Sequence, residues 1–433
     1  MGRAMSGEDE RGTESDGDGN DWDAEVAEWD EEVAEWETDS DGSVDDAGST
    51  DGETVGDAGS TDGETVGDAG STDGETVDDA GSTEGSDQHP TGDSDHRAAD
   101  GPESVDDPDL EPESTDRVPK VVSAGHINWD VTIHVDQLPE PDGETRIQRL
   151  EQSGGGSAAN VAVGLVGLGG QSVVYGSVGG DESGALALRE LASAGVDPGQ
   201  VLVAADEPTS VKYVIVDGEG ELLMLANDGA NESFSAAEFD PDTLRAADHL
   251  HLTGQQPGTA AALATAAGEA DATRSFDPGR RAGDREFDAA LHATDVLFVN
   301  NREADALAAS TDIDPWEPDD RVVAIKLGSD GATIRTPHGD VSHPGFDVDP
   351  VDTTGAGDAF AAGFLGAALR DPEVAAGGFS HDPRDYQVPL LVGNACGAIA
   401  AEAVTARVDL SWDRVRETMG DSPESDLLIE IRV

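Results

Sequence analysis

The feature that most restricts the fold of this chain is an alternation, from about residue 118 onward, of β-branched apolar runs with alanine-rich runs. The stretches "KVVSAGHINWDVTIHV", "HLHLTG" and "DVLFVNN" are typical of buried strands, whereas "ALALRELASAGVD" and "AALATAAGEA" are typical of helices. Strands that alternate with helices favour an α/β fold around a mostly parallel sheet. Residues 117–433 are therefore predicted to form one such domain.

Two segments of this domain have a different pattern. The stretch "DGETRIQRLEQ" at 142–152 alternates polar and apolar residues, and "SVKYVIVDGEGELLMLAND" at 210–228 is typical of a hairpin that turns at "DGEG". We expect both to form a small appendage of antiparallel, half-exposed strands.

Residues 1–116 are predicted to be disordered. They hold 41 acidic residues against three arginines, a net charge of 3 − 41 = −38, and few large apolar side chains. The 11-residue unit "DAGSTDGETVG" occurs at 46–56 and 57–67 and, with a final aspartate, at 68–78. Each unit supplies a single valine, so stacked units could not form a core.

One segment of this region has a helical pattern. Its apolar residues are four or three positions apart, on one face of a helix: Trp22, Val26, Trp29, Val33 and Trp36. Two heptads are too short to be stable alone. The segment is either a helix that docks on an unknown protein partner or a repeat-derived stretch without a partner.

The charge of the chain excludes several classes of partner. There are 94 acidic and 24 basic residues, a net charge of −70, and residues 117–433 contribute 21 − 53 = −32. Such a surplus repels itself unless molar salt screens it. This indicates a cytoplasmic protein of a halophilic archaeon, with an ordinary acidic protein as the alternative. Nucleic acid and membrane partners are not expected, and no run of 18 apolar residues predicts a membrane span.

The stretch "DTTGAGDAFAAGFL" at 352–365 is the strongest candidate for a chemical site. Gly355 and Gly357 allow backbone amides to approach a ligand, and the apolar run that follows predicts a helix. A glycine turn at a helix N-terminus binds anions without a side-chain cation. Asp358 is then either a general base beside a transferred phosphate or only an N-cap of the helix. The motif "GGGSAA" at 154–159 also fits a dinucleotide fingerprint, but the segment before it is too polar for the buried strand required.

Several motifs together resemble the PfkB-type carbohydrate kinases, the ribokinase-like family. In addition to the stretch at 352–365, "GHINWD" (125–130), "GGSAANVAVGLVGLGG" (155–170), "NNRE" (300–303), "KLGSDG" (326–331) and "NACGAI" (394–399) are similar to family landmarks in the family's order. The resemblance covers roughly residues 118–410. It implies a three-layer α/β fold with a mostly parallel central sheet and a small β-strand lid.

The resemblance also implies roles for individual residues. Asp358 matches the catalytic base, and the anion-hole positions are Gly355, Ala356 and Gly357. The sugar-binding positions are Asn128, Asp130, Gly155, Gly156 and Asn160. The nucleotide-binding positions are Lys326, Gly328, Gly331 and Asn394. Asn300 and Glu303 match a motif that organises Mg²⁺ indirectly, although a turn and helix start would also explain them, and Asp352 matches a loop that binds a monovalent cation such as K⁺.

The activity implied is the ATP-dependent phosphorylation of a hydroxymethyl group on a sugar or nucleoside. A free pentose, or a nucleoside stacked on Trp129, is expected first, and a 2-keto-3-deoxy sugar acid or hexose next. A sugar phosphate is expected last because the pocket motifs bring no lysine. Arg146, Arg149 and Lys212 could meet a substrate phosphate or could be ordinary lid residues. A non-catalytic ligand-binding regulator is the alternative function, and a homodimer through the lid is expected.

Overall fold

The computed structural model describes residues 118–139, 142–219, 221–371, 374, 378–403, 405 and 407–420. They all belong to the second of two units into which the chain divides, Glu113–Val433. The predicted disorder of residues 1–116, the Trp22–Trp36 segment and the boundary at residue 117 lie outside the described residues and stay predictions.

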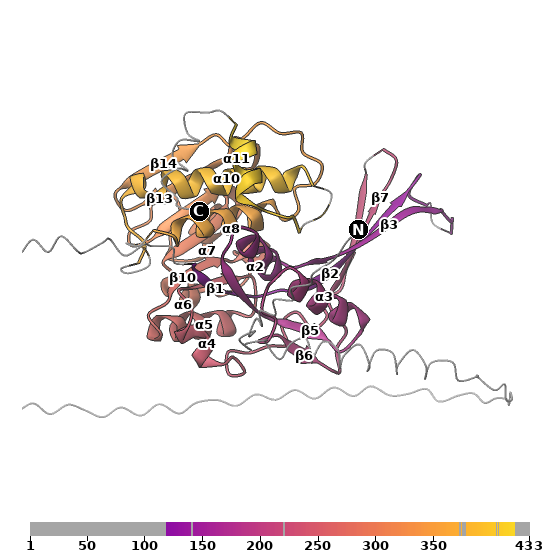
Figure 1. The fold of residues 1–433 in the computed structure, drawn as a ribbon, viewed down its shortest axis with the longest axis horizontal. Helices are drawn as coiled ribbons and strands as arrows, with labels where there is room; N and C mark the ends of the chain where they lie inside the picture. Colours follow the sequence, from indigo (N-terminus) through magenta and orange to yellow (C-terminus); the bar gives the residue numbers. More distant parts are fainter. Residues whose placement is uncertain are drawn as a thin grey trace, which may run out of the picture. The chain divides into compact units, whose positions relative to one another are not determined.

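The centre of the domain is an eight-stranded sheet with the order β14-β13-β12-β11-β10-β9-β1-β4 (Figure 1). The strands from β12 to β4 pair in parallel, and β13 and β14 extend the sheet as antiparallel neighbours. The predicted mostly parallel sheet is therefore confirmed. Its strands are β1 (Lys120–Ala124), β4 (Gln171–Tyr175), β9 (His249–Thr253), β10 (Thr273–Asp277), β11 (Val296–Asn300), β12 (Val322–Lys326), β13 (Ala332–Thr336) and β14 (Gly339–His343).

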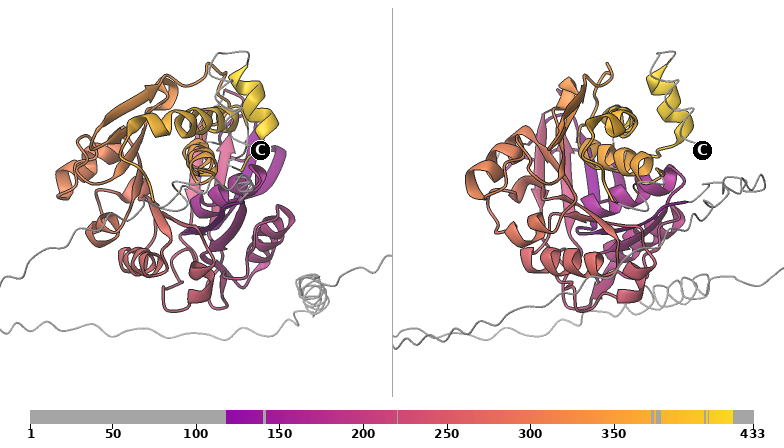
Figure 2. Two further views of the ribbon diagram at one scale, coloured as in Figure 1. Left: turned by 60° about the vertical axis from the view of Figure 1, so that its left-hand side comes forward. Right: turned by 90° about the vertical axis from the view of Figure 1, so that its left-hand side faces the viewer.

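Helices cover both faces of this sheet, which gives the predicted three layers (Figures 1 and 2). Successive strand residues point to opposite faces, so that Val121 and Val122 belong to two different hydrophobic cores. The first core is shared with α2 (Ser157–Gly167), α8 (Ala356–Ala368), α10 (Gln387–Ala401) and α11 (Trp412–Met419). The second is shared with α4 (Pro241–Arg245), α5 (Pro257–Glu269), α6 (Asp288–His292) and α7 (Asn301–Ser310).

A second sheet, β3-β2-β7-β8, forms the predicted lid. Its strands are β2 (Asn128–Val135), β3 (Ile147–Gly155), β7 (Val211–Val216) and β8 (Leu222–Ala226). The antiparallel pairing of β7 with β8 confirms the hairpin at "DGEG". The two predicted lid segments do not pair with each other, because β2 lies between them, antiparallel to β3 and parallel to β7. Below the lid lie α3 (Glu182–Ser193) and a small parallel pair, β5 (Ser177–Gly179) and β6 (Leu202–Ala204).

The run "KVVSAGHINWDVTIHV" supplies one strand to each sheet. The chain leaves the central sheet at Ala124, passes through Gly125 with a φ of 149°, and enters the lid at Asn128. A Cβ atom at Gly125 would lie 1.9 Å from the Thr253 hydroxyl, so only glycine fits this connection. Three residues, 125–127, therefore join the two sheets.

The parallel strands bring chemically active residues to one edge of the central sheet. Asp277, Asn300 and Lys326 are the last residues of β10, β11 and β12. The order of the strands reverses at β1, which has β4 on one side and β9 on the other. Open α/β sheets bind ligands at the carboxyl ends of their strands beside such a reversal. None of the described helices combines the length and apolar character needed to cross a membrane.

Candidate active site

Asp358 lies in the first turn of α8, which begins at Ala356. The residue at the N-cap is Gly355, in the left-handed region with a φ of 80°, and it makes no side-chain cap. Asp358 is the third residue of the helix, and its carboxylate accepts a hydrogen bond from Asn160 Nδ2 at 2.9 Å. The alternative in which Asp358 is only an N-cap is therefore wrong, because the side chain bonds across to α2 and does not cap its own helix.

The glycine turn provides free amides beside Asp358. Ala356 N donates to Thr353 O at 3.2 Å. The amides of Gly355 and Gly357 donate to no carbonyl or side-chain oxygen of the described residues. Both glycine amides at the N-terminus of α8 are thus available to an anion, and the positive end of the helix dipole lies behind them.

The surroundings of Asp358 adjust its acidity. Burial among protein atoms, together with the negative charge of Asp277, raises the pKa of Asp358 to about 6. Hydrogen bonds from Asn160 and Ser157 and the charge of Lys326 act in the opposite direction. A carboxyl group with this pKa is ionised at neutral pH and is still basic enough to take a proton from an attacking hydroxyl.

Lys326 occupies the centre of the site. Its Nζ lies 2.5 Å from Asp277 Oδ2, and a Cβ atom on Gly357 would lie 3.2 Å from the same Nζ. Burial alone would lower the pKa of Lys326, but the carboxylates of Asp277 and Glu303 raise it above its ordinary value. The structure thus places an ammonium group against the glycine turn, which the sequence did not indicate because Lys326 is remote from that turn in the chain.

Asn300 and Glu303 form a capping box at the start of α7. Glu303 N donates to Asn300 Oδ1 at 3.0 Å, and Asn300 N donates to Glu303 Oε2 at 2.9 Å. This is the turn and helix start that the sequence left open as an alternative to a magnesium role. The box engages the Glu303 carboxylate through Asn300.

The donors around Lys326 fit an indirectly bound Mg²⁺. Burial, and next the charge of Asp277, raise the pKa of Glu303. The carboxylates of Asp277, Glu303 and Asp358 all act on the single ammonium group of Lys326. Hard oxygen donors with excess negative charge suit Mg²⁺. Among the described residues no three acidic, histidine or cysteine side chains are close enough to hold a metal by themselves. The fit is therefore through water and substrate oxygens.

The predicted sugar-binding residues lie where the lid meets α2. Asn128 pairs with Gly155 across β2 and β3, and a Cβ atom on Gly155 would lie 2.6 Å from Asp130 Oδ2. Gly156, with a φ of 95°, packs against the backbone of the β1–β2 connection. The Oδ1 atoms of Asp130 and Asn160 are buried and lack a hydrogen-bond partner among the described residues. Two unsatisfied acceptors, one of them on the Asn160 side chain that contacts Asp358, suit a ligand that carries several hydroxyl groups.

Trp129 does not face this pocket. Successive residues of a strand point to opposite sides, so Trp129 lies on the other side of β2 from Asn128 and Asp130. Its side chain is 6% exposed and belongs to the hydrophobic core beneath the lid. The expectation that Trp129 stacks on a nucleoside base is wrong.

The remaining predicted residues lie around the centre. Gly328 and Gly331 have positive φ values of 66° and 77° in the turn after β12. Asn394, on α10, is 3.2 Å from His343 Nδ1, at the end of β14. Asp352 accepts a hydrogen bond from Thr354 N at 2.8 Å, and its charge contributes to the raised pKa of Asp130 after the larger effect of burial. The structure therefore brings residues 352–358 together with residues 128–130 and 155–160.

The structure also shows functional candidates that the sequence did not reveal. Asp277 is one, and its signal was an aspartate at the end of a predicted parallel strand. Arg407 is another: it donates to Glu190 Oε1 at 2.9 Å and to Gly155 O at 3.2 Å, and so holds the end of β3. Of the basic lid residues, Arg149 is an ordinary surface residue, because it forms an ion pair with Glu151.

Comparisons with known proteins agree with this architecture. The model of the pfkB family carbohydrate kinases matches residues 118–413. An ATP-dependent ribose-1-phosphate kinase of Halopiger xanaduensis is 52% identical over 301 residues, which cover 68% of this chain and 96% of that protein. A nucleoside kinase of Methanothermobacter thermautotrophicus is 31% identical over 262 residues, 59% of this chain and 84% of that protein.

Solved structures show the same fold. The Arabidopsis thaliana ribokinase complexed with ribose and ATP has a TM-score of 0.59 and 22% identity, and the match covers 71% of this chain and all of that one. The ribokinase-like three-layer fold expected from the motifs is confirmed, as is the phosphotransferase class with an alcohol group as acceptor. Because the family model spans more than half of the sequence, the chain belongs to the pfkB family of carbohydrate kinases.

Proposed function

We propose that this kinase transfers the γ-phosphate of ATP to the hydroxymethyl group of ribose 1-phosphate. The single observation that carries the choice of acceptor is the 52% identity, over 96% of the length of the relative, to a protein named for that activity. The burial of Trp129 supports it indirectly, since it removes the reason to prefer a nucleoside. The order of substrates expected from the sequence is thereby reversed, with the sugar phosphate first.

The described residues suit an in-line transfer. Asp358 accepts the proton of the acceptor's hydroxymethyl group, the freed oxygen forms a bond to the γ-phosphorus, and the bond to the leaving ADP breaks. The amides of Gly355 and Gly357 and the ammonium of Lys326 stabilise the charge on the moving phosphoryl group. Asp130 and Asn160 orient the acceptor through its hydroxyl groups. The lid sheet covers the acceptor and excludes water, which would otherwise compete for the phosphoryl group.

Two ions are proposed to assist. Asp277 and Glu303 would hold Mg²⁺ through water, and the ion, when bound with ATP, neutralises phosphate charge. Gly328, Gly331 and Asn394 are proposed to line the nucleotide site. Asp352, which already shapes its loop through Thr354 N, is proposed to contribute to a K⁺ site, and the acidic surface suits a cytoplasm rich in potassium salts.

A substrate panel tests the proposed function. ADP release is measured in molar KCl with ribose 1-phosphate, ribose, fructose, 2-keto-3-deoxygluconate, cytidine and guanosine. The highest kcat/KM is expected for ribose 1-phosphate. A higher kcat/KM for another acceptor would replace the proposed substrate, and ligand binding without ADP release from any acceptor would support the non-catalytic regulator.

Replacing Asp130 by asparagine is expected to raise the KM for the acceptor by about 10- to 100-fold and to leave the KM for ATP unchanged. The reason is the loss of charge-assisted hydrogen bonds to the acceptor's hydroxyl groups, each worth roughly 1.5–3 kcal/mol. Steady-state kinetics with each substrate varied in turn measure both constants. Asp136→Asn, at an exposed position at the end of the same strand, is the control, and an unchanged acceptor KM in Asp130→Asn contradicts the assignment.

The lid is proposed to form a homodimer through the exposed part of the sheet face that lies opposite Asn128 and Asp130, beyond the buried Trp129. Several apolar side chains share one face of the sheet: Leu225 pairs with Tyr213, and Leu223 with Ile215, across β7 and β8. Leu225 is 53% exposed and Leu223 is 43% exposed. Unpaired apolar faces of this kind mark association sites.

Light scattering of the full chain is expected to give the mass of a dimer. Leu225→Asp should reduce it to that of a monomer, because a charge on the buried face of the interface is costly. The control Val203→Asp places the same charge on an exposed apolar residue of β6 outside the lid and should leave the mass unchanged. A monomeric wild-type protein would contradict the proposed dimer.

A further inference from the structure

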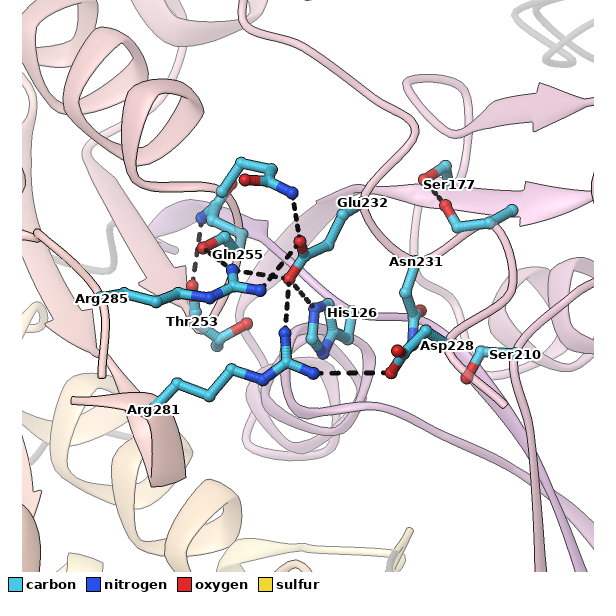
Figure 3. A network of polar contacts seen from close by, with 12 residues as sticks. His126, Ser177, Ser210, Asp228, Asn231, Glu232, Thr253, Gln255, Arg281 and Arg285 are labelled. Atoms are coloured by element: carbon cyan, nitrogen blue, oxygen red, sulfur yellow. Dashed lines mark hydrogen bonds and ion pairs between the residues drawn. The ribbon is translucent and has the colours of Figure 1, made fainter. Parts of the chain in front are cut away.

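A cluster of basic side chains lies beside the acceptor site. Arg285 Nη1 and Nη2 donate to the Glu232 carboxylate at 2.8 and 3.1 Å, and Arg281 Nη1 approaches the same carboxylate at 3.3 Å. His126 Nε2 lies 3.4 Å from Glu232 Oε1. Figure 3 shows the two guanidinium groups and the imidazole ring around this one carboxylate. We call these four residues the Glu232 cluster.

The Glu232 cluster is unusual because basic side chains outnumber acidic ones in it. Residues 117–433 contain only 21 basic residues against 53 acidic ones, and yet two arginines converge on a single glutamate. The hydrogen bond with His126 and those from Arg285 lower the pKa of Glu232 to about 2 against the effect of burial, so Glu232 is ionised. The two arginines carry one more charge than Glu232 neutralises. Among the described residues their further acidic contact is Asp228, which is 94% exposed and 3.5 Å from Arg281 and therefore offsets that charge only weakly.

Asn231 connects the cluster to the acceptor site. Its Nδ2 donates to Asn128 Oδ1 at 2.7 Å, and its Oδ1 accepts from Ile127 N at 3.2 Å. The cluster residues His126 and Glu232 are thus within two positions of Asn128 and Asn231 in the chain. The cluster adjoins Asn128 through Asn231, whereas Asp358 contacts Asn160 on α2, so the two sites can serve different ends of one acceptor.

The two arginines differ in how firmly they are held. Arg285 has a 19% exposed side chain and also donates to Gln255 O at 2.7 Å. Arg281 is 45% exposed, and its two contacts, at 3.3 and 3.5 Å, are long for charge-assisted hydrogen bonds. Arg285 therefore anchors Glu232, while the Arg281 guanidinium can turn to a stronger anion.

We infer that Arg281, supported by the Glu232 cluster, binds the phosphate that the acceptor already carries. A guanidinium group binds phosphate through two parallel hydrogen bonds, which would replace the two long contacts of Arg281. Arg285 adds positive potential behind it, and Glu232 keeps both guanidinium groups in place. This inference deepens the proposed function and rests on it, since only a phosphorylated acceptor needs such a site.

The test separates the acceptor's phosphate from the rest of the reaction. Arg281→Gln is expected to raise the KM for ribose 1-phosphate by about 10- to 100-fold, while the KM for ATP and the kcat/KM measured with unphosphorylated ribose stay unchanged. Arg281→Lys should recover part of the affinity, because it restores the charge without the planar pair of donors. Arg280→Gln, at the exposed neighbouring position outside the cluster, is the matched control.

Calorimetric titration of ribose 1-phosphate into the wild type and Arg281→Gln, in molar KCl without ATP, gives a second measurement that does not depend on turnover. If the wild type binds and phosphorylates ribose 1-phosphate and Arg281→Gln has the same KM for it, the phosphate site alone is overturned. Equal losses for ribose and for ribose 1-phosphate would show a structural salt bridge and also overturn it. A wild type that neither binds nor phosphorylates ribose 1-phosphate would overturn the proposed function and this site together.

Discussion

Replacing Asp358 by asparagine is expected to lower kcat by about 10²- to 10⁴-fold, the usual contribution of a general base. The amide has nearly the same shape and can keep the contact with Asn160, but it cannot accept the proton of the acceptor hydroxyl. ATP binding should persist, because the amides of Gly355 and Gly357 and the Lys326 ammonium remain. Single-turnover kinetics and ATP titration measure the two properties separately.

The pH dependence identifies the group that is lost. With the pKa of Asp358 raised to about 6, wild-type kcat should be low below pH 6, rise through that value as the carboxylate forms, and level off above it. Asp358→Asn should lack this inflection. The control Asp340→Asn changes an exposed aspartate of β14 and should keep both the rate and the inflection. Near wild-type turnover in Asp358→Asn would remove the assignment of the base.

The stability of the same variant has a predictable sign. A carboxyl group whose folded-state pKa lies above its unfolded value of 3.8 binds its proton more tightly in the folded state. Ionisation of Asp358 therefore costs stability as the pH rises from about 4 to about 6, and the cost persists above pH 6. Asp358→Asn removes it, so thermal unfolding at pH 8 should show a variant at least as stable as the wild type. A large loss of stability would mean that the lower activity of Asp358→Asn results from unfolding and not from the missing base.

Replacing Lys326 by methionine is expected to lower kcat/KM for ATP by about 10²- to 10³-fold, the scale seen when one group that stabilises transition-state charge is removed. The ammonium is the positive group among Asp277, Glu303 and Asp358, and it lies against Gly357. Its loss leaves three carboxylates beside the phosphates of ATP without their lysine. Initial rates at varied ATP measure the effect.

A second readout distinguishes this role from simple packing. The charge of Lys326 lowers the pKa of Asp358 and of Glu303, so its removal should move the inflection of the rate profile to a pH above 6. Lys326→Arg should restore the inflection more fully than it restores the rate. Lys120→Met, at the opposite end of the central sheet in β1, is the matched control. An unshifted inflection in Lys326→Met would contradict the central position of the ammonium.

The fold could be predicted because its signals are local. Strand and helix runs alternate along the chain, and the glycine motifs mark the turns at which helices begin. The pairing order of the lid could not be predicted in this way, because β2, β3 and β7 come from segments whose neighbours are set by tertiary packing. The side of β2 on which Trp129 points was accessible from the alternation of strand residues, since Asn128 and Asp130 were already assigned to the pocket.

The candidate site was predictable only where its residues share a motif. Asn160 and Asp358 each belong to a glycine-rich signature, but their hydrogen bond joins two helices that lie far apart in the chain. Lys326 was assigned to the nucleotide loop from its motif, yet its ammonium reaches Asp277 on another strand. The Glu232 cluster has no shared sequence signature, because His126, Glu232 and the two arginines come from three separate connections that only the sheet brings together.

The three-residue link between β1 and β2 has a consequence for how this enzyme can change. Groups proposed to handle the nucleotide lie on the central layers, whereas Asn128 and Asp130 belong to the lid that begins directly after the link. Substitutions in the lid can therefore retune which acceptor is taken while the donor half keeps its geometry. A new acceptor preference could evolve through a few lid residues, with the phosphoryl-transfer apparatus inherited intact.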